Sequence, residues 1–249
     1  MGYTHAATGA AVASSAALFI GNNSTSLFVV AVIAGTIGGV AIDIEVRDNK
    51  ENPKVTDAGR TRIATLGLIV LGVLLDFALK LGIITKNITN PSQAVYGLVV
   101  FVLLMIAGSK TKHRTFTHSL LFTMLTGVCV YLVLPEASVF YVIGCLSHLL
   151  LDMLNKPFNN HGVWLLYPKK GKGIALGLCK SARTGNKVSY FIAIILFSVI
   201  SVVYSLLDIN IWRITPIIIL LAYIVLAMHF VRIKSEREQR HIMHIRGEL

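Results

Sequence analysis

Long apolar stretches separated by short polar connections dominate this chain of 249 residues. About eight of them have the composition of membrane-embedded helices, at residues 5–20, 27–42, 62–84, 92–109, 118–134, 138–155, 188–208 and 212–233. Several are shorter than the ~20 residues that a perpendicular span needs. Short or re-entrant helices are expected where a bundle packs around a polar site. The pattern therefore predicts an all-α, polytopic transmembrane helix bundle.

The composition supports this fold class. Hydrophobic residues make up 55% of the chain and charged residues only 14%, whereas a soluble domain is about 25% charged. The three cysteines are too few and too scattered for a disulfide framework or a cysteine-type zinc site. The net charge of +11 is explained by the bias of membrane proteins towards basic cytoplasmic loops, so no nucleic-acid partner is expected.

The positions of the charges predict the orientation. All but three of the 23 Lys and Arg residues fall in the tail or in connections on one side of the eight segments; the exceptions are Lys80, Lys86 and Arg213. Because basic loops stay in the cytoplasm, we expect both termini there, in the inner (cytoplasmic) cell membrane. One transmembrane domain would span 1–233, followed by a charged cytoplasmic tail, 234–249. Within it, 155–187 forms a long basic loop whose Trp164 and Tyr167 suit the headgroup level.

Seven ionisable side chains fall on the cytoplasmic side of this topology: His5, Asp43, Glu45, His113, His118, His148 and Asp152. His148 and Asp152 are four residues apart, so they share one face of a helix. Thr117 has the character of an N-cap, which would place His118 in the first helical turn after it. Because burying ionisable groups in a membrane is costly, such a cluster is expected to be functional.

Imidazoles and carboxylates together suit zinc, manganese or iron. We expect one or two divalent ions, zinc first, with manganese, iron or magnesium as alternatives. The expected metal ligands are His5, Asp43, His118, His148 and Asp152.

The remaining polar residues are assigned to the reaction. His113, Arg114 and Glu45 are the expected catalytic residues, and Lys156 with Arg114 would bind an anionic group of the substrate. Two of them have a plainer interpretation. Glu45, like Asp43, could be a solvated loop acid, and Arg114 could be ordinary positive-inside charge. The roles of Asp76, His161 and His229 stay open.

The motifs resemble those of the YdjM-like family of membrane-bound, predicted metal-dependent hydrolases, over roughly residues 1–170. Thr4-His5 matches the family's Thr-His, and Ile42 to Glu45 stands where the family has Pro-Asp-Ile-Asp. His113 to Ser119 matches His-Arg-Gly-x-Thr-His-Ser, with Thr115 in place of the glycine. Ser147-His148 with Asp152 matches Ser-His-x-x-x-Asp, followed by Gly162-Val163 and Tyr167-Pro168.

This resemblance implies a hydrolase but leaves its substrate undefined. The His and Asp pattern is also similar to zinc phospholipase C and P1-type nucleases, which hydrolyse phosphate esters. We therefore expect a metal-dependent hydrolase that acts on a phosphoester of a membrane lipid or lipid-linked phosphate at the inner leaflet. The alternatives are a transporter or channel that uses the cluster as a binding site, and a metal-stabilised structural membrane protein. The oligomeric state stays open.

The charge asymmetry yields a first prediction. A single reporter cysteine placed beside Leu249 should react with a membrane-impermeant maleimide only after the cytoplasmic face is opened, because the tail is expected inside. The measurement is labelling of intact and permeabilised cells or spheroplasts. Labelling of intact spheroplasts would overturn the predicted orientation.

Overall fold

The computed structural model describes residues 2–20, 25–45, 88, 90–156, 162–169, 173–178, 184–207 and 221. This part of the chain contains six α-helices and no strand, so the all-α prediction is confirmed. The elements are α1 (Gly2–Phe19), α2 (Thr25–Ala41), the 3-10 turn η1 (Ile42–Glu45), α4 (Pro91–Ser109), α5 (Leu120–Val133), α6 (Pro135–Leu154) and α7 (Thr184–Leu207). The predicted segments 62–84 and, apart from residue 221, 212–233 lie outside the described residues, so a total of eight is not confirmed.

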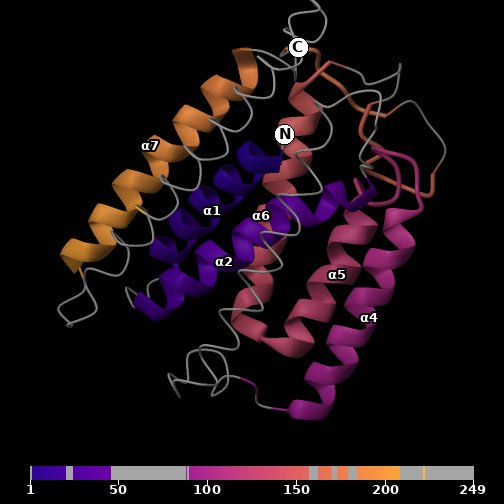
Figure 1. Cartoon of the computed structure of the whole chain (residues 1–249), viewed down its shortest axis with the longest axis horizontal. Helices are drawn as coiled ribbons and strands as arrows, with labels where there is room; N and C mark the ends of the chain where they lie inside the picture. Colours follow the sequence, from indigo (N-terminus) through magenta and orange to yellow (C-terminus); the bar gives the residue numbers. More distant parts are fainter. Residues whose placement is uncertain are drawn as a thin grey trace, which may run out of the picture.

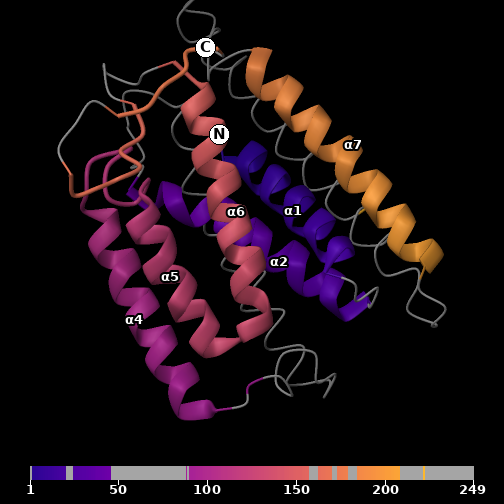
Figure 2. The same cartoon turned by 180° about the vertical axis from the view of Figure 1, so that it is seen from behind.

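The helices form one bundle in which α6 is central (Figure 1). Helices α1 and α2 pack on each other and on α6, α7 covers α1, and α5 lies between α6 and α4. The view from behind shows the same order (Figure 2). Three described segments are long and apolar enough to cross a membrane: Ser26–Glu45, Pro91–Ser109 and Pro135–Leu154.

Apolar side chains cover the outside of this bundle. On α4 and α7 they include Leu98, Val102, Leu103, Ile192 and Ile195, all exposed. Helix α5 has only 14 residues, which agrees with the expectation of short helices. A lipid environment requires an apolar outer surface. It also requires helices, because a helix satisfies the polar groups of its own backbone.

Glycines bring α1, α2 and α6 into backbone contact. A Cβ atom at Gly35 would collide with the carbonyl oxygen of Gly9 on α1, and one at Gly144 would collide with that of Gly35. A Cβ at Gly39 would collide with the carbonyl oxygen of His5. Small residues allow such approaches, and here they bring the ends of three helices together at His5 and Gly39.

The start of α5 differs from the prediction. Ser119, and not Thr117, is the N-cap: its hydroxyl accepts a hydrogen bond from the backbone N–H of Phe122 at 3.1 Å. His118 therefore lies in the turn before the helix instead of in its first turn. A tertiary contact helps to set this start, because the N–H of Leu120 bonds to the carbonyl of Leu165 at 3.0 Å.

Two loops gather at the end of the bundle where α6 finishes (Figure 1). One is 110–119, between α4 and α5. The other comprises 162–169 and 173–178, which are joined by an antiparallel bridge between Val163 and Ile174. The second loop also bonds to the first, through the N–H of Trp164 and the carbonyl of Arg114 at 3.0 Å.

The glycine contacts yield a second prediction. Gly144→Val should lower the free energy of unfolding by at least about 1–3 kcal/mol, because its side chain would collide with the backbone of α2. Ala107→Val, at an exposed position of α4, is the matched control and should be near neutral. Thermal unfolding of both variants in detergent measures this. Equal midpoints for the two would contradict the close packing.

Candidate metal centre

All seven ionisable side chains predicted to converge do so at one end of the bundle. They come from α1, η1, the 110–119 loop and α6. Six are buried, with exposed fractions of 8% or less, and His113 is partly exposed. This burial excludes the interpretation of Asp43 and Glu45 as solvated loop acids.

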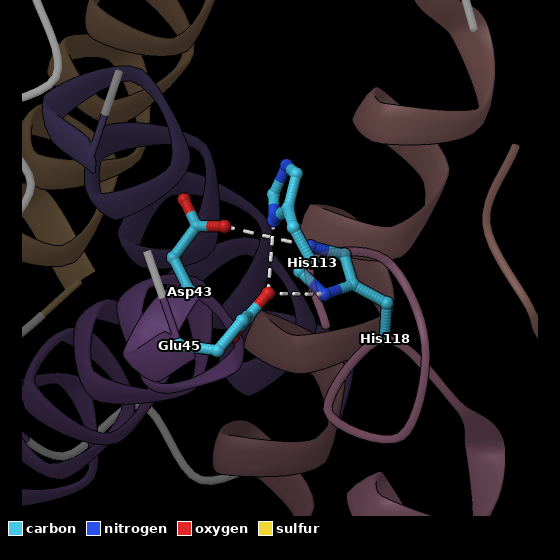
Figure 3. A group of neighbouring side chains, drawn as sticks. All are labelled: Asp43, Glu45, His113 and His118. Carbon is cyan, nitrogen blue, oxygen red and sulfur yellow. Dashed lines mark hydrogen bonds and ion pairs between the residues drawn. The ribbon is translucent and has the colours of Figure 1, made fainter. Parts of the chain in front are cut away.

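A kink lets both acids of η1 face the cluster. Two residues apart on a regular α-helix, their side chains would point to nearly opposite sides. The backbone of Asp43 departs from helical geometry, with φ −82° and ψ 20°. As a result Asp43 and Glu45 approach the two ring nitrogens of one imidazole, that of His118 (Figure 3).

Glu45 joins two imidazoles by short contacts. Its Oε1 lies 2.9 Å from Nδ1 of His113 and 3.1 Å from Nδ1 of His118. These are hydrogen-bond lengths. With Glu45 as a carboxylate, both Nδ1 atoms carry hydrogen, so either ring, when neutral, has its lone pair on Nε2.

His148 is oriented in the same way by the backbone. Its Nδ1 lies 2.7 Å from the carbonyl oxygen of Gly39, which can only accept. The lone pair therefore sits on Nε2, which is buried without a hydrogen-bond partner, as is Nε2 of His118. His5 stacks on His148 with ring centroids 3.8 Å apart. A hydrogen bond from the second ring nitrogen is the usual arrangement of histidines that bind metal.

The distances among the expected ligands differ from those around Glu45. Nε2 of His118 lies 3.2 Å from Oδ2 of Asp152 and 3.4 Å from Oδ1 of Asp43. Nε2 of His148 lies 3.5 Å from Oδ1 of Asp43 and 3.9 Å from Oδ2 of Asp152. Nε2 of His5 is 3.7 Å from Oδ1 of Asp152.

Most of these separations are too long for hydrogen bonds, which end at about 3.2 Å. Two donors that each lie about 2.1 Å from one ion at a tetrahedral angle are about 3.4 Å apart. The five predicted ligands therefore have the spacing of groups that could hold a metal ion. These residues, with Glu45 and His113, form overlapping sets of three or four. Within each set, one possible ligand atom per residue lies within 4.8 Å of the others.

The charge of the cluster points the same way. Asp43, Glu45 and Asp152 are three buried carboxylates, and Arg114 is the buried cation beside them. With neutral histidines the net charge is negative by two, which a divalent cation would balance. Burial lowers the pKa of His118, but Glu45, Asp152 and Asp43 outweigh it and raise this pKa well above its ordinary value. Protons would therefore compete with a metal ion for this imidazole.

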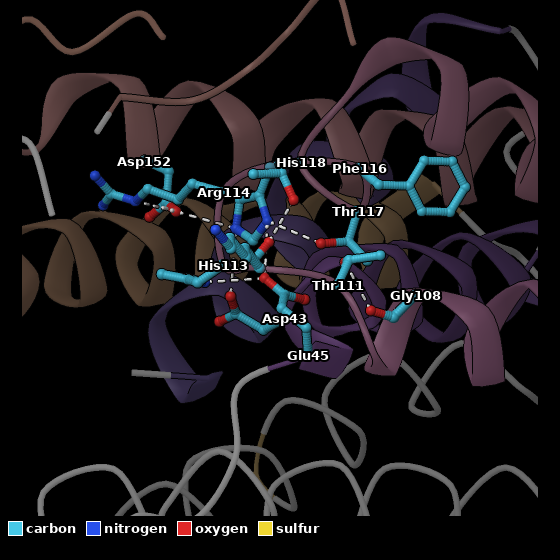
Figure 4. Close-up of polar contacts among 12 residues, drawn as sticks. Asp43, Glu45, Gly108, Thr111, His113, Arg114, Phe116, Thr117, His118 and Asp152 are labelled. Carbon is cyan, nitrogen blue, oxygen red and sulfur yellow. Dashed lines mark hydrogen bonds and ion pairs between the residues drawn. The ribbon is translucent and has the colours of Figure 1, made fainter. Parts of the chain in front are cut away.

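Arg114 belongs to the supporting structure of the site. Its Nε lies 3.4 Å from Oδ2 of Asp152 (Figure 4). Its Nη1 donates to the backbone carbonyl of Lys156 at 3.2 Å. Its backbone is left-handed, with φ 63°, a conformation that costs a non-glycine residue about 1–2 kcal/mol. Buried and paired, Arg114 is not merely surface charge. The side chain of Lys156 is exposed at the rim.

Sequence reasoning missed the backbone and packing partners. The carbonyl of Gly39 has no signal in residue type, since any residue would supply one. Trp164 and Tyr167 are only partly exposed, and Tyr167 packs on Phe116 with ring centroids 5.6 Å apart. They therefore also support the 110–119 loop. Asp76, His161 and His229 lie outside the described residues.

A family model described as YdjM inner membrane protein matches residues 1–235. The chain belongs to this family. The match covers every residue of the candidate centre, and the family's description agrees with the expected inner-membrane location. No curated protein and no solved structure matches the chain.

The geometry yields a third prediction. The purified protein should hold at least one divalent transition metal per chain. The double variant His148→Ala with Asp152→Asn should lose the metal, because two of its ligands are removed. Elemental analysis of the purified proteins measures this. Glu136→Gln, at an exposed position near the other end of α6, is the control and should keep the metal. A metal-free, folded wild type whose unfolding midpoint ignores chelator would contradict the site.

Proposed function

We propose that the chain is a membrane-embedded, metal-dependent hydrolase that cleaves a phosphoester of a membrane lipid or lipid-linked phosphate at the inner leaflet. The observation that carries this proposal is a set of buried imidazoles and carboxylates whose atoms have the spacing of metal ligands. Two of the imidazoles also have buried Nε2 atoms that could face a metal ion. A purely structural cluster would be expected to close into hydrogen bonds, which most of these distances exceed. A divalent metal, when bound, polarises a phosphoryl oxygen and lowers the pKa of a coordinated water.

His113 is the best placed residue to move a proton. Its side chain is 27% exposed, while those of Glu45 and His118 beside it are fully buried, so substrate would enter on its side of the cluster. Hydrolysis removes a proton from water as the oxygen–phosphorus bond forms, and returns one to the leaving alkoxide. Nε2 of His113 would accept the first proton and supply the second, while Glu45 holds the ring through Nδ1.

The cations have different parts in this proposal. The exposed side chain of Lys156 would attract the anionic headgroup, which stays at the interface while the acyl chains remain in the bilayer. Arg114 would hold Asp152 in place. Its guanidinium already contacts Asp152 and the Lys156 carbonyl, so a substrate that bound Arg114 would share it with both groups.

The fourth prediction separates these roles. His148→Ala should lose both metal and turnover. His113→Gln should keep the metal yet lower kcat by about 10²–10⁴-fold, because it removes the proton carrier and no predicted metal ligand. Lys156→Gln should mainly raise KM for anionic lipids. The assay measures release of phosphate or alcohol from a panel of lipid phosphates and phosphodiesters with zinc, manganese or magnesium added.

A transporter would give the opposite set of results. If no lipid of the panel is cleaved, while the reconstituted protein moves an ion or solute and His148→Ala stops that movement, the hydrolase proposal is wrong. Metal without turnover or transport would favour a metal-stabilised structural protein.

A further inference from the structure

The loop formed by 162–169 and 173–178, here called the capping loop, exposes large apolar side chains that the fold does not use. Leu166 is 64% exposed, Leu176 59% and Leu178 73%, and Ile174 is also exposed. Along 174–178 the exposed positions alternate with partly buried ones, so three of these four side chains lie within five residues of one another. Apolar groups gathered on a surface in this way mark a contact with a partner or a membrane.

Backbone hydrogen bonds attach the capping loop firmly to α6. The N–H of Leu176 bonds to the carbonyl of Met153 at 2.7 Å, and that of Leu178 to the carbonyl of Leu154 at 3.0 Å. The segment thereby satisfies carbonyls that the end of a helix leaves unpaired. Because α6 is long and apolar enough to cross a membrane and ends here, the attached loop lies at the membrane boundary.

The charges around the capping loop favour one kind of partner. Among the described residues at this end, the exposed charged side chains are all lysines: Lys110, Lys112, Lys156 and Lys169. The acids of the same region, Asp43, Glu45 and Asp152, are buried. Exposed leucines beside lysines fit a surface of anionic lipid headgroups over acyl chains. A symmetric contact with a second copy would instead bring these lysines towards one another.

We propose that the capping loop inserts Leu166, Ile174, Leu176 and Leu178 into the boundary between headgroups and acyl chains, and so holds the centre against the leaflet that supplies its lipid. The last clause rests on the proposed function, while the lipid contact itself does not. The loop is bonded to the site on two sides, through Arg114 and through α6. Lipid drawn to the loop would thus be next to the rim at Lys156.

Depth-dependent fluorescence quenching tests the contact. Leu176→Cys and Leu178→Cys, each combined with Cys179→Ser, would carry an environment-sensitive dye in vesicles of phosphatidylcholine and phosphatidylglycerol. Cys129 and Cys145 are buried, and the Cys179→Ser protein alone gives the labelling background. Leu103→Cys, exposed on α4, is the deep reference, and Lys169→Cys is the shallow one.

The expected result is a blue-shifted emission at 176 and 178, and quenching by lipids brominated near the headgroup that is several-fold stronger than quenching by aqueous iodide. Leu103→Cys should respond most to lipids brominated deep in the chain. Iodide quenching without lipid quenching would overturn the proposal, because the loop would then face water. Shielding that depends on protein concentration instead of on brominated lipid would overturn it in favour of a second copy.

A kinetic arm tests the link to the site. Leu176→Ser with Leu178→Ser should raise the apparent KM for vesicle lipid several-fold, while leaving metal content and kcat for a short-chain soluble phosphoester unchanged. An unchanged KM would overturn delivery by the loop. If the wild type cleaves no lipid, the proposed function fails, and the quenching result still decides whether the loop contacts the bilayer.

Discussion

Three carboxylates buried at one end of an apolar bundle are the constraint on which the rest of this structure depends. Desolvating an unbalanced charge costs several kcal/mol, and Arg114 offsets only one of the three. Four imidazoles surround the remainder, two of them with buried Nε2 atoms that have no hydrogen-bond partner. A cation shared by these donors would resolve both problems at once, since it would balance charge and use the lone pairs.

Close helix packing makes this arrangement attainable. His5 and His148 stack where α1, α2 and α6 meet through glycines, at positions where a carbonyl of the neighbouring helix leaves no room for a Cβ atom. The same contact brings the carbonyl of Gly39 to Nδ1 of His148 and so selects its tautomer. Small residues in the apolar helices thus determine the chemistry of the polar end, although none of them carries a functional group.

The residues of the site could be read from the sequence, but their relationships could not. The order of the apolar segments was enough to place His5, Asp43, His118 and His148 at one end of the bundle, because helix ends are local features. The kink at Asp43 and the left-handed Arg114 are tertiary outcomes that residue type does not announce. The start of α5 was misplaced for a related reason. Ser119 caps the helix in place of Thr117, and the N–H of Leu120 bonds to the carbonyl of Leu165.

Arg114 has more contacts than its residue type alone could predict. An arginine beside a histidine motif suggests an anion-binding group, yet this one links three parts of the chain. Its guanidinium reaches Asp152 and the Lys156 carbonyl, and its own carbonyl accepts from Trp164. Because the capping loop, α6 and the 110–119 loop meet at this residue, the left-handed strain is offset by contacts on every side. A displacement of the capping loop would therefore be transmitted through Arg114 to Asp152.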